Sequence, residues 1–356
     1  MKLSNNINAL VRQMETRLQR IANVLLLNSS FTNHLGLLNG KMGIAIFFYL
    51  YGQYTKIKLY ENFADDLIDE IYNELNIELP IDFSGGLMGI GWGIEYLVQN
   101  RFLEGDTDDV LKEIDDAVYR ATLRTPLLVE SDKDLYGFGL YYLARLQGKV
   151  ADDSNLNTII KKQMLVYLHD DCERLLSLDE ICDKKVLPLT IGQLKSILFF
   201  IIGTQRLCVF PIKLTNIEHY VIKYLRRNKM CTNSKAEIAA IKFLLLKCGE
   251  NVLDVRLKNK FKQATGTIRL EEVIADNDCM ISDFTKAAWN ALVYSVPDNV
   301  FNNNLLHERK IFGIVDNEVN WEQRLSELGN DNLGLNDGMA GLGLAILQRV
   351  LKYKGL

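Results

Sequence analysis

The sequence has few prolines, and their scarcity permits a chain that is almost entirely helical. Only five prolines occur in 356 residues, and Pro80, Pro188 and Pro297 lie at the boundaries of apolar segments. Because proline disrupts the interior of a helix, this placement favours helices between the prolines. Strand-like alternation of apolar and polar residues is also scarce, which argues against a sheet.

The sequence also lacks a hydrophobic run of membrane-spanning length. Its longest strongly apolar run, residues 197–203, is far shorter than the roughly 20 residues that a spanning helix needs. Arg and Glu interrupt the apolar pattern of residues 1–27, so this segment has no signal-peptide core. We therefore expect a cytoplasmic protein with no membrane span and with its six cysteines mostly reduced.

An excess of positive charge is absent as well. The 41 Lys and Arg residues are outnumbered by 45 Asp and Glu residues, which gives a formal net charge of -4. No tract of clustered basic residues offsets this balance, so the composition excludes an electrostatic nucleic-acid binder.

A glycine motif of the form G-x-x-G recurs along the chain and begins an apolar segment each time. The clear copies are Gly40-Lys41-Met42-Gly43, Gly86-Leu87-Met88-Gly89 and Gly338-Met339-Ala340-Gly341. Weaker copies follow Gly137 and Gly192, and apolar segments without the glycines begin near Ser234 and Asp283. This repeat predicts seven apolar helices that start roughly 40 to 60 residues apart.

A more polar, amphipathic segment follows most of the apolar ones, most clearly at residues 59–75 and 110–118. Residues 5–27 form a further amphipathic segment, and it would supply the missing partner of the last apolar helix. The fold class predicted from this alternation is all-α. Its architecture is an α/α toroid of about seven inner and seven outer helices, in a single domain over residues 1–356. The irregular segment 299–332 is expected to form loops.

Glycines at a helix entrance have two physical uses. They permit close approach of backbones or a positive φ, and they leave the first N–H groups of the helix open to a negatively charged ligand. We expect six glycines to be architectural in this way, at the mouth of the ring: Gly40, Gly43, Gly86, Gly89, Gly338 and Gly341.

The segments GLLNGKMGIAIFFYLYG, DFSGGLMGIGWGIEYLV and GLNDGMAGLGLAIL resemble the repeats of the lanthionine synthetase C-like (LanC-like) family. The resemblance runs from about residue 30 onward and is weak between residues 150 and 330. It implies an α/α toroid and the chemistry of lantibiotic cyclases, which join a cysteine thiol to a dehydrated serine or threonine of a precursor peptide. In these enzymes a zinc ion held by two cysteines and a histidine activates the thiol.

The sequence departs from this family at the zinc ligands. It contains no Cys-His dipeptide, and Cys279 is followed by methionine where the family has histidine. His169 and Cys172 have ligand spacing on one helix face, but they lie on a predicted outer helix, so we expect a solvated histidine and a packed cysteine. We predict no metal site and no cofactor. Cys208 and Cys248 lie in apolar segments and are expected to be protected from thiol reagents.

Five residues are candidates for a functional site. The resemblance implies that Asp134 matches a catalytic aspartate of the family, with a helix N-cap as the alternative role. Asp82, Trp92, Glu95 and Asp337 lie near the glycine motifs and would line a substrate cavity. The alternative for both aspartates is a cap or a turn, and for Trp92 it is the hydrophobic core.

Several functions are consistent with these features. The first is a degenerate LanC-like protein that binds a precursor peptide, or assists a peptide-modifying enzyme, without zinc chemistry. The others are an active thioether-forming cyclase, a glycan hydrolase that uses paired carboxylates among Asp82, Glu95 and Asp134, and a pure interaction scaffold.

Overall fold

The computed structural model describes residues 2–124, 134–149, 154–181, 189–228, 231–232, 235–252, 254–266, 269–270, 292 and 332–355. Helices dominate these residues, so the all-α fold class is confirmed. Within the described ranges, the strands β1 (Cys231–Thr232) and β2 (Arg269–Leu270) form one short parallel pairing. None of the described helices has the length and apolarity to cross a membrane.

Apolar and amphipathic helices alternate along the chain in the predicted order. The inner, apolar helices are α2 (Lys41–Thr55), α4 (Leu87–Gln99), α7 (Asp134–Leu146), α9 (Ile191–Leu207), α11 (Lys235–Asn251) and α16 (Met339–Lys354). The outer helices are α1 (Lys2–Asn28), α3 (Lys58–Glu74), α6 (Lys112–Arg124), α8 (Leu156–Ile181), α10 (Pro211–Arg227) and α12 (Val255–Ala264). Two short helices, η1 (Ser29–Phe31) and α5 (Thr107–Val110), lie between them. The helix predicted near Asp283 lies outside the described residues, as does the segment 299–331.

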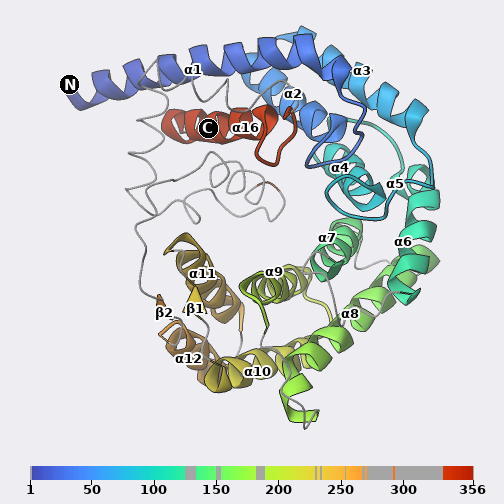
Figure 1. Ribbon diagram of the computed structural model, residues 1–356, viewed down its shortest axis with the longest axis vertical. Helices are drawn as coiled ribbons and strands as arrows, with labels where there is room; N and C mark the ends of the chain where they lie inside the picture. The colour runs from blue at the N-terminus through green and yellow to red at the C-terminus, as the bar shows by residue number, and fades with distance from the viewer. Residues whose placement is uncertain are drawn as a thin grey trace. The chain divides into compact units, whose positions relative to one another are not determined.

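The chain packs as two compact units, Met1–Gly105 with Asn277–Leu356 (unit 1) and Asp106–Asp276 (unit 2). In unit 1, α2 packs between α16 and α4, and α1 and α3 cover α16 and α2 (Figure 1). In unit 2, α9 packs between α7 and α11, while α8, α10 and α12 form the outer layer. Each unit therefore has an inner and an outer layer of helices. The closed toroid and the single domain stay predictions.

Helix α1 is the outer partner of α16, although the two helices lie far apart in the sequence. They run side by side in Figure 1. A Cβ atom at Gly343 of α16 would lie 3.1 Å from Ile21 Cγ2 of α1, and Lys354 Nζ lies 2.6 Å from Glu15 Oε1. The predicted pairing of the segment 5–27 with the last apolar helix is confirmed.

Three entry loops, residues 34–40, 80–86 and 332–338, cap α2, α4 and α16 through the backbone. In each loop, the first N–H of the helix donates to the carbonyl group seven residues earlier. These bonds are Lys41 to His34 (2.8 Å), Leu87 to Pro80 (2.8 Å) and Met339 to Asn332 (2.9 Å). Gly341 N–H likewise donates to Gly334 at 3.1 Å. The alternative use, in which N–H groups at the helix start are open to a ligand, is therefore wrong for these four groups, because the preceding loop already satisfies them.

The three entry loops are also joined to one another. Asn336 N–H donates to the carbonyl oxygen of Leu38, and Leu38 N–H donates to that of Ser84, both at 2.8 Å. All three residues stand at the same position of their loops, four residues after the loop begins. The bonds thus form a ladder that runs from the loop of α16 to that of α2 and on to that of α4.

The glycines of the motif leave room for carbonyl groups. At four of them, an added Cβ would overlap the carbonyl oxygen six residues earlier: His34 for Gly40, Leu37 for Gly43, Pro80 for Gly86 and Phe83 for Gly89. A Cβ at Gly338 would lie 2.9 Å from the oxygen of Asn332. The N-cap glycines have extended φ values of -145°, -108° and -122°. Their architectural role therefore rests on close backbone approach, and the alternative of a positive φ is wrong for them.

The second glycine of the first two motifs, Gly43 or Gly89, has a further neighbour, a buried leucine from the preceding loop in the ladder. An added Cβ at Gly43 would lie 2.7 Å from Leu335 Cγ, and one at Gly89 would lie 2.9 Å from Leu37 Cβ. Both leucines are almost fully buried. Glycine at these positions thus permits close contact both with the entry loop of the same helix and with the neighbouring entry loop.

We predict that Gly89→Ala destabilises the protein by about 1–3 kcal/mol, because the new methyl group overlaps a main-chain oxygen that cannot move without breaking the loop. Gly85→Ala is the control: Gly85 lies four residues earlier, in the loop that contains Phe83, and its Cβ would meet nothing within 4 Å. Urea unfolding followed by circular dichroism measures both variants. Equal midpoints for the two variants would contradict the role assigned to the carbonyl contact.

Candidate functional site

Two of the predicted cavity residues, Asp82 and Asp337, shape turns. Asp82 is exposed, and its Oδ1 accepts hydrogen bonds from the backbone N–H groups of Ser84 and Gly85, both at 2.8 Å. Asp337 has a left-handed φ of 56° and directly precedes Gly338, the N-cap of α16. The turn role, which the sequence leaves open for both residues, accounts for these geometries.

The other two predicted cavity residues belong to the core of α4. Trp92 is 4% exposed; its ring stacks on Tyr96 with 5.3 Å between centroids and meets the edge of Phe83 at 6.1 Å. Glu95 is 1% exposed, and its Oε1 accepts a hydrogen bond of 2.8 Å from Gln99 Nε2. For Trp92, the core role is the one that the structure supports.

Asp82 and Glu95 do not lie together as a catalytic pair would. The backbone of Asp82 lies beside Gly86 at the start of α4, whereas Glu95 lies about 12 Å further along the helix axis at 1.5 Å per residue. Glycosidase carboxylates flank a single bond at roughly 5–9.5 Å, so the geometry does not favour Asp82 with Glu95. Asp134 is the first residue of α7, and its side chain lies outside the described residues.

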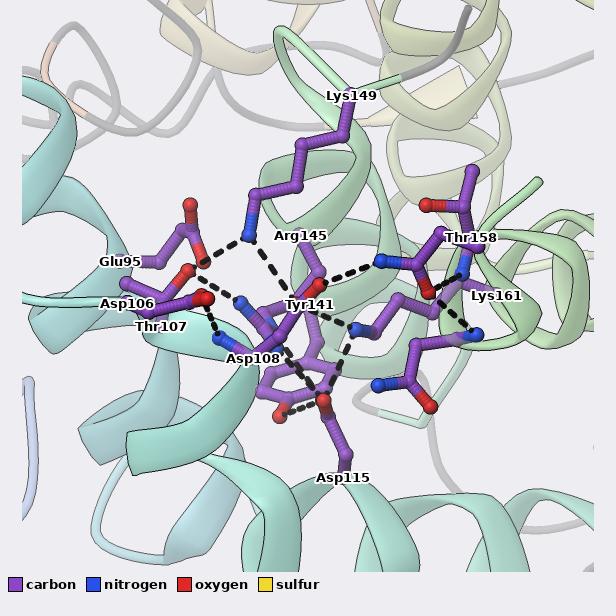
Figure 2. A network of polar contacts seen from close by, with 12 residues as sticks. Glu95, Asp106, Thr107, Asp108, Asp115, Tyr141, Arg145, Lys149, Thr158 and Lys161 are labelled. Atoms are coloured by element: carbon purple, nitrogen blue, oxygen red, sulfur yellow. Dashed lines mark hydrogen bonds and ion pairs between the residues drawn. The ribbon is translucent and has the colours of Figure 1, made fainter. Parts of the chain in front are cut away.

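A buried charge network in unit 2 joins α5, α6, α7 and α8 (Figure 2). Its centre is Arg145 of α7, which is fully buried. The guanidinium group binds both oxygens of Asp115, with Nε 3.0 Å from Oδ1 and Nη2 2.6 Å from Oδ2. Nη2 also lies 2.9 Å from Asp108 Oδ1, and Nη1 lies 2.9 Å from Thr107 Oγ1. One side chain thus ties α7 to α5 and α6.

Two lysines and a tyrosine complete this charge network. Lys161 Nζ from α8 lies 3.1 Å from Asp108 Oδ1 and 3.0 Å from Asp115 Oδ2, and Lys149 Nζ lies 3.1 Å from Asp108 Oδ1. Tyr141 OH donates to Asp115 Oδ1 at 2.6 Å. Figure 2 shows these side chains converging on the two aspartates.

The network keeps both aspartates ionised. Burial alone would raise the pKa of each carboxyl group, but Lys161 and Lys149 hold the pKa of Asp108 below its ordinary value, and Arg145 and Lys161 do the same for Asp115. A carboxylate held in this way is a poor general base at neutral pH, because its proton affinity is lowered. The network therefore serves to hold four helices together. This network was not identified from the sequence. The feature that could have indicated it is Arg145, the one charged residue in the apolar segment 137–146.

The cysteines differ in exposure. Cys172 and Cys248 are fully buried, and burial raises the pKa of both thiols. Cys248 Sγ donates to the carbonyl oxygen of Leu198 at 3.6 Å. Cys208 is exposed, because α9 ends at Leu207 and Cys208 forms its C-cap with a φ of 55°. The expectation of protection stays a prediction for Cys248, and for Cys208 the structure contradicts it.

His169 is also placed differently from the expectation. It is fully buried rather than solvated, and its ring lies 4.7 Å from that of Phe200 on α9. The outer helix α8 turns this histidine toward the inner layer. Within the described ranges, no group of three His, Cys, Asp or Glu side chains is arranged to hold a metal ion. Cys279, the residue nearest to the family's ligand region, lies outside those ranges.

No protein-family model matches the chain, and no curated protein is significantly similar to it in sequence. The LanC-like resemblance therefore rests on the repeat segments themselves.

We predict that Asp115→Asn destabilises the protein by about 3–5 kcal/mol at pH 7, because it leaves Arg145 and Lys161 short of a buried counter-charge. Since the folded pKa values of Asp108 and Asp115 are lowered, their stabilisation is present above the unfolded value near 4 and is lost as the pH falls below it. The variant should accordingly lose part of the acid dependence of the urea midpoint. The control is Asp109→Asn, which removes the same charge from an exposed residue next to Asp108. An Asp115→Asn protein as stable as the Asp109→Asn protein at pH 7 would exclude this role.

We predict that a thiol reagent modifies Cys208 in the folded protein before Cys172 or Cys248, because a thiol must be exposed and ionised to react. Peptide mapping after brief iodoacetamide treatment measures the order. Modification of Cys248 as fast as that of Cys208 would contradict the burial assignment. Treatment in denaturant should remove the difference.

Proposed function

We propose that this protein is a LanC-like α/α toroid of ribosomal-peptide maturation that binds a precursor peptide, or a peptide-modifying enzyme, in the cytoplasm. The observation that carries the proposal is the ladder of entry loops. Three G-x-x-G loops, the segments that resemble the LanC-like repeats, adopt the same capping bonds and bond to one another at equivalent positions. A repeat geometry of this kind supports a ring closed from the last repeat to the first.

The proposed role is that of an accessory protein without zinc-dependent cyclisation. Cyclisation requires a thiolate on the peptide cysteine, which the family obtains from a zinc ion bound by two cysteines and a histidine. Support comes from the sequence, in which methionine follows Cys279, and from the burial of Cys172 and Cys248. An active cyclase with ligands in the undescribed segments is the alternative that the experiment separates.

The experiment uses the full chain and a fluorescent synthetic peptide that contains one cysteine and one dehydrobutyrine. Fluorescence anisotropy measures binding, and alkylation with iodoacetamide followed by mass spectrometry counts free peptide thiols. The alkylation step is needed because addition of the thiol to the double bond leaves the peptide mass unchanged. We expect saturable binding and no loss of thiol beyond that in the absence of protein.

Catalytic consumption of the thiol, abolished by Cys279→Ser with the helical circular dichroism spectrum intact, would establish the cyclase alternative. Absence of both binding and thiol loss would overturn the peptide-binding role. A matched peptide with alanine in place of cysteine and of dehydrobutyrine tests whether binding depends on the reacting groups.

A further inference from the structure

A second polar site lies on α8, away from the charge network described above. His169 Nδ1 lies 2.5 Å from the carbonyl oxygen of Leu165. Because a carbonyl oxygen only accepts hydrogen bonds, Nδ1 carries the proton, and Nε2 presents its lone pair. Nε2 is buried and has no hydrogen-bond partner among the described residues. Metal-binding histidines have this arrangement: one ring nitrogen donates a hydrogen bond to a backbone carbonyl, and the lone pair of the other is available to the metal ion.

Glu173 lies four residues after His169, so the two share one face of α8. Its Oε1 is buried and, within the described part of the chain, it too lacks a partner. Of the neighbouring cations, Lys213 pairs with Asp170 and acts on His169 and Glu173 through its charge without a hydrogen bond to either, and Arg174 pairs with Asp171. An imidazole nitrogen and a carboxylate oxygen, both acceptors, are thus buried on one helix face, and no described residue donates a hydrogen bond to either.

Buried acceptors without a partner are costly and call for an ion or a donor that satisfies them. We propose that His169 Nε2 and Glu173 Oε1 bind a first-row divalent transition metal ion, of which Zn²⁺ is the probe, with water in the remaining positions. A neutral imidazole with a carboxylate suits this class of ion better than Mg²⁺ or Ca²⁺, which prefer oxygen ligands alone.

One further observation supports the site. The rings of Phe200 and Phe210 lie 4.7 Å and 6.2 Å from the imidazole and limit access of water from that side. Glu173 is only partly buried, which leaves a route of entry along its side chain.

The experiment measures Zn²⁺ bound by the chelator-stripped full chain in equilibrium dialysis at pH 7.5, with metal quantified by mass spectrometry. The test variants are His169→Gln and Glu173→Gln. The matched control is His219→Gln: His219 Nδ1 makes the same bond to the carbonyl four residues earlier, at 2.8 Å, but the side chain is exposed and Lys223 stands where Glu173 stands in the site. Cys279→Ser serves as a second control.

We expect each test variant to weaken Zn²⁺ binding by at least about tenfold, with both controls unchanged and all circular dichroism spectra alike. If His169→Gln fails to fold, Glu173→Gln alone carries the test. Binding equal to wild type in the folded test variants, or no binding by the wild type, would overturn the site. Loss of Zn²⁺ in Cys279→Ser alone would overturn the site and also the role without zinc-dependent cyclisation proposed above. Failure of the α8 site alone leaves that role intact.

Discussion

The hydrogen-bonded ladder between entry loops is the interaction on which unit 1 depends. Each rung joins backbone atoms, so it places no demand on side-chain identity at Asn336, Leu38 or Ser84. It does require close approach of the backbones, because carbonyl groups lie where the Cβ atoms of five motif glycines would be: Gly40, Gly43, Gly86, Gly89 and Gly338. Side chains at those positions would push the loops apart and expose the first N–H groups of α2, α4 and α16, which have no other partner in the helix.

The ladder changes how the glycine motif is understood. A helix start with open N–H groups attracts anions, but here the loop before the helix supplies the acceptors itself. In the entry loop of α4, residues 80–86, a side chain also supplies an acceptor: the carboxylate of Asp82 accepts a hydrogen bond from the N–H of Ser84. In the other two loops the equivalent position holds Gly36 or Gly334, and each faces the backbone of the next loop.

The alternation of helices could be predicted because the spacing of apolar residues distinguishes apolar from amphipathic segments. The pairing of α1 with α16 followed from the number of segments, since the last apolar helix otherwise had no amphipathic partner. The charge network could not be predicted, since the partners of a lone arginine such as Arg145 are defined only when α5, α6 and α8 are packed around it. The exposure of Cys208 and the burial of His169 depend on where α9 ends and which way α8 faces. Helix boundaries and helix rotation are set by tertiary packing, which apolar spacing reports only in part.

Unit 1 is built from two segments that are far apart in the chain, so it cannot be completed until the end of translation. Its inner layer places α16 against α2, although residues 56–338 separate these helices in the chain. During translation α2 and α4 emerge early, but the loop that donates to Leu38 and the helix α16, which packs against α1 and α2, arrive only after all of unit 2 has been synthesised. Unit 2, a continuous segment, is complete at that point. The nascent chain therefore has to keep the apolar faces of α1 and α2 from aggregation until α16 leaves the ribosome, and a chaperone that binds apolar helices would be most needed in that interval.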